Sequence, residues 1–490
     1  MLMTESVLEP LTTSSANAVA DTCATLLGMQ TMLRAVLLLC CTSIACSFVV
    51  PARPLLAPAR IATKSLQPSI AASRPTTSLF AEVRTNELTN TRAVTLALAC
   101  VVAAVVALDR VVMSVAILPM AQVYGFDEST KGLVAASFSA GYGIGILPAG
   151  ALVAARPPAL VLGAGLIAWS AAQAATPAAA ALGLAPLFLA RACMGAGEAA
   201  AIPSLQVVAA QNVGEAERSR FWGVLTACLS LGTIAAYALT PPLIARFGWE
   251  AAFYAYGGLG VLVALAWAAV TASDDDVGAA AEPVDWAQLR ASRPVWALAC
   301  AHSASNFLLY FALAWLPTFF SYTFGASATA SATASLAPFA AGAASCVVAG
   351  ATADALAPRL GLTRTRKLVQ GVAFLGPALA LTALAVLEET GGLTEGVAEG
   401  LFVLTFACQA ASGSGFGVGA QDIAKRQASA IYGLSTLPAV AAGAASQYAT
   451  GVILDATHND FSPVFALAAT TQLLGLAAFW RWFEAERVFD

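Results

Sequence analysis

Long apolar runs alternate with short polar breaks from residue 93 to the C-terminus. A helix that crosses a bilayer needs about 20 predominantly apolar residues, and runs of this kind recur twelve times. The pattern predicts an all-α membrane protein with twelve transmembrane helices. The predicted spans lie near 93–119, 131–155, 158–178, 183–210, 219–245, 249–271, 294–322, 327–355, 366–387, 397–420, 427–453 and 461–483.

One polar stretch, SDDDVGAAAEPVDWAQLRASRP, separates the first six runs from the last six. The halves also match, because GALVAA at Gly150 and GATADA at Gly350 each end the second span of their half. Two six-helix repeats around a site at mid-membrane depth are typical of secondary transporters. The predicted organisation is a leader at 1–81, an N-terminal bundle at 93–271, an inter-domain loop at 272–293 and a C-terminal bundle at 294–484.

Basic residues are divided unequally between the two sets of loops. The loops after even-numbered spans carry eleven Lys and Arg residues, whereas the loops after odd-numbered spans carry two, Lys131 and Arg246. Because basic loops remain on the side from which a protein is inserted, both termini are expected on the basic side, which in a plastid is the stroma. The eleven residues are Arg156, Arg218, Arg220, Arg290, Arg293, Arg359, Arg364, Arg366, Lys367, Lys425 and Arg426.

Composition supports a membrane protein and disfavours several classes of function. Hydrophobic residues make up 59% of the 490 residues and charged residues 11%, against about 25% charged in soluble domains. The net charge of -4 gives no reason to expect a nucleic-acid partner. The cysteines have no metal-binding spacing and the chain has only two histidines, so we expect no metal and no cofactor. An intramembrane enzyme would need a base beside its nucleophile, and the GSG at 413–415 has no nearby histidine.

The first 81 residues have the composition of a two-part targeting leader. Between Asp21 and Glu82 there is no acidic residue, and five arginines or lysines occur. MLRAVLLLCCTSIACS at 32–47 has the basic start, short apolar core and small final residues of a signal peptide. The stretch that follows is basic and rich in Ser, Ala and Pro, as transit peptides are. We therefore predict a multi-pass protein of a plastid membrane; the alternative is an N-terminal tail that is not removed.

Four charged residues lie within predicted spans and away from their ends: Asp109, Arg110, Arg191 and Glu198. A charge at the bilayer centre costs at least about 2.5–3.5 kcal/mol and faces a bundle interior or a water-filled path. Two guanidiniums form a natural receptor for an oxyanion such as phosphate or carboxylate. Glu198 can gain and lose a proton, so it is a candidate for the coupling ion. Asp109 is expected to hold Arg110 in place or to join the gate, and it is a second candidate for the coupling ion or proton. The alternative is that Asp109–Arg110 and Arg191–Glu198 only neutralise each other.

Several segments then suggest a family. LDRVVMSVAILPMA at 108–121, SFSAGYGIGILPAG at 137–150 and LARACMGAGEAAAIP at 189–203 resemble the first, second and fourth spans of the anion:cation symporters of the major facilitator superfamily, which include plastid phosphate transporters, sialin and vesicular glutamate transporters. GVILDAT at 451–457 resembles the end of their eleventh span. The resemblance implies a major facilitator fold. It also implies that Arg110 and Arg191 bind the substrate and that Glu198 serves the coupling ion.

The chain departs from this family at positions that bear on substrate choice. Val112 replaces a common Asn, Ser305 falls where glutamate carriers have Arg, and Gly419-Ala420 replaces an Asn-His pair. A carrier without that third charge resembles a glutamate transporter less. The reduced set of polar groups is compatible with a smaller anion, altered coupling or lower selectivity.

Other polar residues in the spans are secondary candidates. Tyr142, Asn306 and Tyr310 are candidate substrate-binding residues, with helix packing as the alternative. Asp354 and Asp422 lie near span ends on the basic face and are expected to brace a gate there. His302 is a candidate for proton relay, against a structural role. The glycines of SGSGFGVG at 412–419 are expected to allow close helix approach or bending rather than to bind phosphate.

The sequence therefore predicts a monomeric secondary transporter in a lipid bilayer. It is expected to move a small anion, inorganic phosphate above others, coupled to a proton or sodium ion. Transport of an organic anion such as ascorbate or a carboxylate rests on the same residues and stays open. The third hypothesis is a sensor that keeps the transporter fold but does not transport.

Overall fold

The structure is a computed structural model that describes residues 77–214, 218–271, 286–424 and 427–486. The chain divides into two compact units, Met1–Phe80 and Ala81–Asp490, and the helices that form the site belong to the second. Residues 1–76 of the predicted leader and residues 272–285 of the predicted inter-domain loop lie outside the described residues, as do Lys425 and Arg426.

Within the described residues, twelve helices are long and apolar enough to cross a membrane, which confirms the predicted number. The ends of the first, from Thr91 to Tyr124, and the last, from Ser462 to Trp482, lie within a few residues of the predicted ones. The helices of the first half are α2 (Thr77–Tyr124), α3 (Glu128–Ala155), α4 (Pro158–Leu182), α5 (Leu184–Glu198), α6 (Ala201–Asn212), α7 (Arg218–Phe247) and α8 (Trp249–Thr271). Those of the second half are α9 (Trp286–Ala291), α10 (Arg293–Phe324), α11 (Ala328–Leu360), α12 (Leu362–Glu389), α13 (Glu395–Gln409), η1 (Ala410–Gly413), α14 (Gly419–Ile423), α15 (Ala428–Thr457) and α16 (Ser462–Trp482).

The fourth and tenth spans are interrupted rather than continuous. The fourth divides into α5 and α6 directly after Glu198. The tenth, predicted as one helix over 397–420, is helical only to Gln409 and continues through η1 and turns to α14. Gln370 of α12 fills the bend, because its Oε1 accepts a hydrogen bond from the Phe416 amide at 2.9 Å and occupies the space that a Cβ on Gly415 would need. The glycine-rich segment therefore bends the chain.

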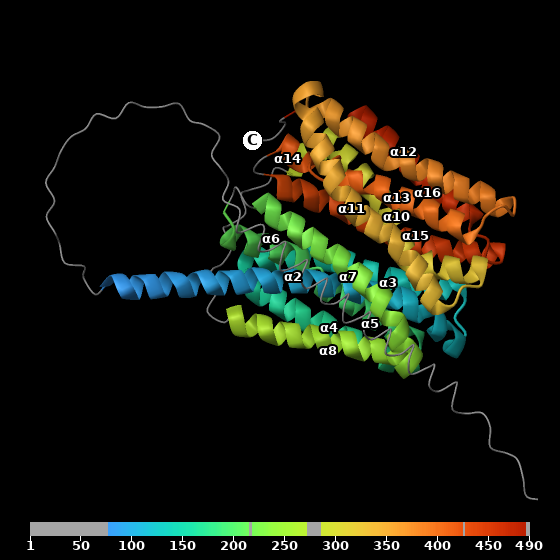
Figure 1. The fold of residues 1–490 in the computed structure, drawn as a ribbon, viewed down its shortest axis with the longest axis horizontal. Coiled ribbons are helices and arrows are strands. Elements are labelled where there is room, and N and C mark those ends of the chain that lie inside the picture. The colour runs from blue at the N-terminus through green and yellow to red at the C-terminus, as the bar shows by residue number, and fades with distance from the viewer. Residues whose placement is uncertain (1–76, 215–217, 272–285, 425–426, 487–490) are drawn as a thin grey trace, which may run out of the picture. The chain divides into compact units, whose positions relative to one another are not determined.

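The spanning part of α2 and helices α3–α8 form one group and α10–α16 another, and the two groups lie side by side (Figure 1). Within the groups, α4 packs against α5 and α8, and α12 packs against α13 and α16. Between the groups, the main contacts join α3 to α15 and α7 to α11. Spans two, five, eight and eleven therefore connect the two halves.

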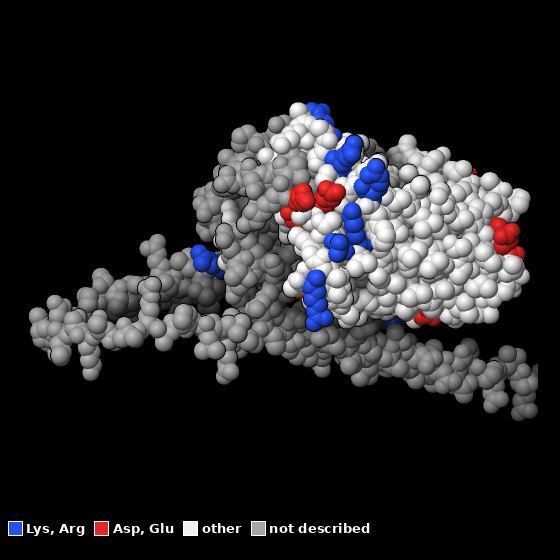
Figure 2. All heavy atoms as spheres, turned by 90° about the horizontal axis from the view of Figure 1, so that it is seen from above, with Lys and Arg blue, Asp and Glu red and all other residues white. Residues whose placement is uncertain are grey.

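Lys and Arg side chains gather near one end of the second group on the face shown in Figure 2. The last turn of α11 and the first turns of α12 contribute Arg359, Arg364, Arg366 and Lys367 to this basic end. Farther along α12 from this basic end, apolar side chains such as Leu379 are exposed. Exposed apolar side chains are typical of a surface that faces lipid. We call the basic end of the helices the inner end and the opposite end the outer end.

Small residues set the distance between α3 and α5. A Cβ on Gly195 of α5 would collide with the backbone carbonyl of Phe138, and one on Gly141 of α3 would collide with the backbone of Ala192. Because lipid supplies no hydrophobic force between helices, such backbone approach supplies much of the packing energy. It also fixes the positions of Arg191 and Glu198, which lie on the same helix as Gly195.

We predict that Gly195→Val lowers the free energy of unfolding by about 3 kcal/mol, because the added atoms force α3 and α5 apart. Thermal unfolding of the purified protein in detergent, followed by tryptophan fluorescence, measures the loss. Gly258→Val is the matched control, because it makes the same change in a helix where no atom lies within 4 Å of the new Cβ. Equal melting temperatures for the two variants would contradict this account of the packing.

Candidate functional site

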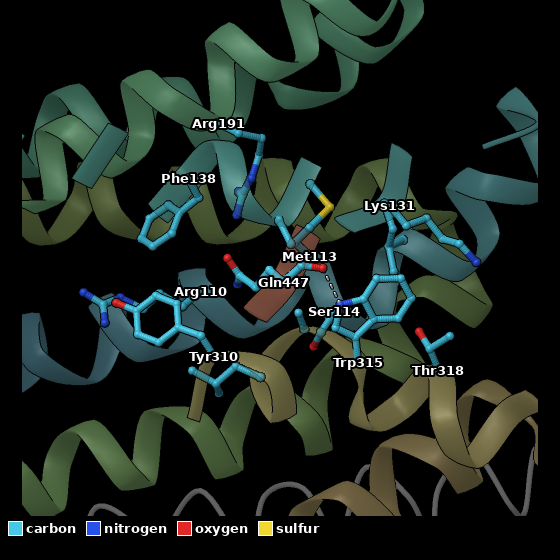
Figure 3. Close-up of a pocket in the computed structure, with 14 residues that line it drawn as sticks. Arg110, Met113, Ser114, Lys131, Phe138, Arg191, Tyr310, Trp315, Thr318 and Gln447 are labelled. Atoms are coloured by element: carbon cyan, nitrogen blue, oxygen red, sulfur yellow. Dashed lines mark hydrogen bonds between the residues drawn. The ribbon is translucent and has the colours of Figure 1, made fainter. Parts of the chain in front are cut away.

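A cavity of about 40 Å³ lies between the two groups of helices and holds both buried arginines. By the same measure one water needs roughly 10–15 Å³, so the space suits a small solute. Figure 3 shows Arg110, Arg191, Phe138 and Tyr310 toward one end of the cavity and Lys131 and Thr318 toward the other. The lining residues come from α2, α3, α5, α10 and α15.

Arg110 forms an ion pair with Glu198 across the first group of helices. Its Nε donates to Glu198 Oε1 at 2.5 Å, and its Nη2 contacts the same oxygen. The Arg110 side chain is 22% exposed, whereas Glu198 is fully buried. The other Glu198 oxygen, Oε2, is buried without a hydrogen-bond partner among the described residues. Arg110 therefore reaches the cavity while one side of its guanidinium is held by a carboxylate.

Arg191 has no carboxylate partner within ion-pair distance in the described part of the chain. It is 2% exposed, its Nη1 donates to Gln173 Oε1 at 3.3 Å and lies 2.9 Å from Met194 Sδ, and its Nε has no hydrogen-bond partner. The Phe138 ring offsets part of the cost of burying this charge, because its centroid lies 5.5 Å from Arg191 Cζ and 5.6 Å from Arg110 Cζ. A buried, incompletely satisfied cation beside a cavity is a receptor for an anion.

Asp109 does not hold Arg110, contrary to one expectation from the sequence. Its Oδ2 accepts a hydrogen bond from Trp169 Nε1 at 3.2 Å, and its Oδ1 accepts one from Gln173 Nε2 at 3.3 Å. Adjacent residues on a helix point in different directions, so Asp109 faces α4 while Arg110 faces the cavity. Since Gln173 also accepts from Arg191, Asp109 orients Arg191 through Gln173. The simple neutral pairs, Asp109–Arg110 and Arg191–Glu198, are therefore not the ones that form.

The predicted aromatic residues lie at the site, and the predicted asparagine does not. Tyr310 lines the cavity, and the Tyr142 ring centroid lies 5.1 Å from Arg110 Cζ. Asn306, one turn from Tyr310, is half-buried and is not among the cavity-lining residues. Ser305 accepts a hydrogen bond from Gln409 within the second group of helices.

The two aspartates predicted near a gate have different surroundings. Asp422 accepts hydrogen bonds from Arg366 at 2.7 and 3.3 Å, and Arg366 also donates to the Ser414 carbonyl. This contact braces the bend of the tenth span at the inner end. Asp354 is exposed and forms no ion pair with any described residue. Its role in a gate stays a prediction.

His302 packs between two aromatic rings away from the arginines. The centroids of Phe416 and Tyr432 lie 5.2 and 5.3 Å from that of the imidazole, and its Nδ1 lies 3.1 Å from Ser435 Oγ. Since His302 does not line the cavity, its contacts support the structural role rather than the relay.

Three residues that line the cavity were not predicted from the sequence to belong to the site. Gln447 of α15 lines the cavity, and its Oε1 accepts a hydrogen bond from Ser139 of α3 at 2.7 Å, so it connects the two halves. Phe138 lies within the SFSAGYG segment, but an uncharged aromatic residue in an apolar span does not indicate a binding site by itself. Lys131 was expected in a loop, but it lies in the first turns of α3, is 3% exposed and lines the cavity.

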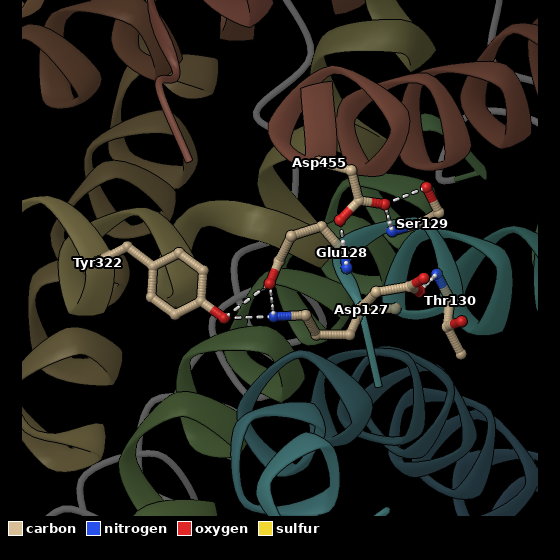
Figure 4. A network of polar contacts seen from close by, with 7 residues as sticks. Asp127, Glu128, Ser129, Thr130, Tyr322 and Asp455 are labelled. Carbon is tan, nitrogen blue, oxygen red and sulfur yellow. Dashed lines mark hydrogen bonds and ion pairs between the residues drawn. The ribbon is translucent and has the colours of Figure 1, made fainter. Parts of the chain in front are cut away.

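The outer end of the cavity is closed by contacts between α3 and the second group of helices (Figure 4). Asp455 of α15 accepts hydrogen bonds from the backbone amides of Glu128 and Ser129 at 3.0 and 2.8 Å, and from the Ser129 hydroxyl. The first amides of a helix have no partner within that helix. Asp455 therefore caps α3 from the other half, and the cap can exist only while the outer end is closed.

Comparisons with known proteins show the family of the chain. The family model of the Major Facilitator Superfamily matches residues 99–447. The chain is 34% identical over 406 residues to the probable anion transporter 1, chloroplastic, of Oryza sativa subsp. japonica, covering 78% of this chain and 75% of that protein. It is 33% identical to the sodium-dependent phosphate transport protein 1, chloroplastic, of Arabidopsis thaliana, covering 78% and 77%. It is 32% identical to the ascorbate transporter, chloroplastic, of the same species, covering 78% and 73%.

Solved structures share the fold at low identity. A bacterial homolog of the human lysosomal transporter Spinster, inward-facing and occupied, aligns with a TM-score of 0.65 and 16% identity over 80% of this chain and 97% of that one. A D-xylose–proton symporter aligns with a TM-score of 0.64 and 15% identity over 81% and 99%. The chain therefore has a twelve-helix transporter fold. It belongs to the Major Facilitator Superfamily.

The location follows from the same findings. The twelve spans make the chain a multi-pass membrane protein, and the relatives at 32–34% identity are all chloroplastic. The chain is therefore a protein of a plastid membrane.

We predict that Asp109→Ala lowers the free energy of unfolding by about 2 kcal/mol or more, because Trp169 and Gln173 lose the acceptor for their buried donors. Thermal unfolding in detergent measures this effect. Asp354→Ala removes an exposed carboxylate and is the matched control, with no change expected. A melting temperature for Asp109→Ala equal to that of the control would contradict the assigned hydrogen bonds.

Proposed function

We propose that this protein is a secondary active transporter that moves a small anion, inorganic phosphate above others, by alternating access. The observation that carries the proposal is Arg191. Its guanidinium is 2% exposed, has no carboxylate partner among the described residues and lines a cavity together with Arg110. Keeping such a charge at this depth is costly, and an anion that enters the cavity would offset the cost. The chloroplastic anion and phosphate transporters among the relatives support the same substrate class.

The charges of the site also supply a reason for coupling. Asp109 and Glu198 balance Arg110 and Arg191, and Glu128 balances Lys131, so the cavity without substrate is formally neutral. An anion that enters alone would add an uncompensated charge in a region of low dielectric constant. A cation that enters with it restores the balance. Glu198 is the group that we assign to this cation, because a proton or a sodium ion on its carboxylate would release Arg110 to the anion.

Alternating access would use the contacts that join the two halves. At the outer end, Asp455 and the first turn of α3 hold the halves together in this structure. Loss of the α3–α15 and α7–α11 contacts at that end, with closure at the inner end, would expose Arg110 and Arg191 to the other side. The site would then stay fixed while the two groups of helices rock around it.

Phosphate is favoured over a larger anion because the cavity is small. The site also has two guanidiniums, and the uncharged Ser305 stands where glutamate carriers have a third. An ascorbate transporter is among the relatives, so an organic anion is the second candidate. Competition against labelled phosphate uptake distinguishes the two, because ascorbate would compete only if it occupies the same site.

We predict that Arg110→Ala and Arg191→Ala each lower phosphate uptake into proteoliposomes by about a hundredfold, because each removes a charge-assisted contact to the anion. Proton and sodium gradients are imposed separately. Arg481→Ala, which removes an exposed arginine of α16, is the control and should transport as the wild type does. Uptake at the wild-type rate by both cavity variants would contradict the proposed substrate site.

Transport by the wild type is the test of the wider proposal. Uptake of phosphate along one gradient supports coupled phosphate transport. Failure with phosphate but uptake of ascorbate or a carboxylate would favour the organic-anion transporter. Failure of a folded preparation across a broad panel of anions would favour a sensor that keeps the transporter fold.

For Glu198→Gln, we predict loss of gradient-driven accumulation while exchange of internal for external phosphate is partly retained. A neutral amide cannot take part in the protonation or ion-binding step, but it leaves the two arginines in place. Uptake measured across a series of pH values and sodium concentrations gives the readout. A variant with the pH and sodium dependence of the wild type would exclude Glu198 as the coupling residue.

A further inference from the structure

Lys131 places a third cation in the same cavity, at the end away from the arginines. Its side chain is 2% exposed and lies on α3, seven residues before Phe138. Residues seven apart share one face of a helix and are separated by about 10 Å along its axis. Figure 3 shows the ammonium end of Lys131 pointing away from Arg191, toward the outer end of the helices. Lys131 therefore lies about two helical turns outward from Phe138, whose ring lies beside both arginines.

A short network holds this ammonium in the closed state (Figure 4). Lys131 Nζ lies 2.5 Å from Glu128 Oε1 and contacts the hydroxyl of Tyr322, whose ring centroid is 4.7 Å away. The Tyr322 hydroxyl donates to the same Glu128 oxygen at 2.9 Å, while Glu128 Oε2 is buried and has no hydrogen-bond partner among the described residues. The carboxylate of Glu128 thus occupies the place beside Lys131 that an external oxyanion would take.

The network depends on the closed outer end, because its members come from both halves. Lys131 and Glu128 belong to α3, whereas Tyr322 belongs to α10. Asp455 of α15 fixes the Glu128 backbone in the same closed arrangement. Separation of α3 from α10 and α15 would remove Tyr322 and the helix cap. Lys131 would then be a cation at the mouth of the open cavity, with Glu128 as its contacting partner and the Asp127 carboxylate close by at the start of the same helix.

We propose that Lys131 is a second anion-binding position, at the outer entrance of the cavity, and that the transported anion and Glu128 compete for it. The inference rests on the proposed function and adds a step to it. An oxyanion that arrives from the outer side binds Lys131 first and then moves inward to Arg110 and Arg191. When the anion leaves Lys131, Glu128 returns to the ammonium and the outer end closes.

The competition gives the two residues opposite effects on transport. Lys131→Gln removes the outer cation and leaves a neutral polar side chain one atom shorter, so the KM for phosphate should rise about tenfold, the loss of one charge-assisted contact. Lys131→Arg keeps the charge and should stay near the wild-type KM. Glu128→Gln removes the competitor, so the KM should fall below that of the wild type. Phosphate–phosphate exchange in proteoliposomes of the full chain measures these values without an imposed ion gradient.

The double variant Glu128→Gln/Lys131→Gln separates anion binding from gate stability. If Lys131 serves only to neutralise Glu128, the double variant has no unpaired charge and its KM returns to the wild-type value, which would overturn the inference. If Lys131 binds the anion, the KM of the double variant stays about tenfold above the wild type. Melting temperatures of all variants report whether the fold is kept.

The same experiment distinguishes this inference from the proposed function. A wild type that exchanges neither phosphate nor ascorbate contradicts the proposed function itself. A wild type that exchanges one of them, with the same KM in Lys131→Gln and in Lys131→Arg, contradicts only the role of Lys131.

Discussion

The ion pair between Arg110 and Glu198 is the interaction on which the rest of the site depends. Glu198 is fully buried and has one oxygen in contact with the guanidinium and the other without a partner. In an environment of low dielectric constant, leaving either charge without its partner is costly. Any event that removes Glu198 from Arg110 must therefore bring another anion to Arg110, another cation to Glu198, or both. In the proposed function, that constraint would link the substrate to the coupling ion.

The surrounding structure keeps this pair in position by close backbone contact. Gly195 and Gly141 bring α5 and α3 together, and Gln173 links Asp109 to Arg191. Farther out, the contacts are of a different kind. Asp455, Tyr322 and Lys131 join the halves through polar groups that water can replace. The core of the first group is thus built to stay fixed, while the outer contacts are built to be exchanged.

The sequence predicted the helices well because lipid imposes a simple length and polarity rule on them. It also predicted the four buried charges, since such residues are rare in apolar spans. It did not predict their partners, because a sequence does not tell which side chains of different helices meet. Asp109 was expected beside Arg110 but contacts Trp169 and Gln173. Lys131 was counted as a loop residue because it lies four residues after Asp127, three after Glu128, and at the start of an apolar run.

The most direct test of the account is the affinity of the purified protein for phosphate with and without the Glu198 carboxylate. Equilibrium dialysis of radiolabelled phosphate against the wild type and Glu198→Gln, at mildly alkaline pH, measures both dissociation constants. If Glu198 and the anion compete for Arg110, the variant binds phosphate about tenfold more tightly than the wild type. A dissociation constant equal to or higher than that of the wild type would contradict the account, because Glu198 would then orient Arg110 rather than compete with the anion.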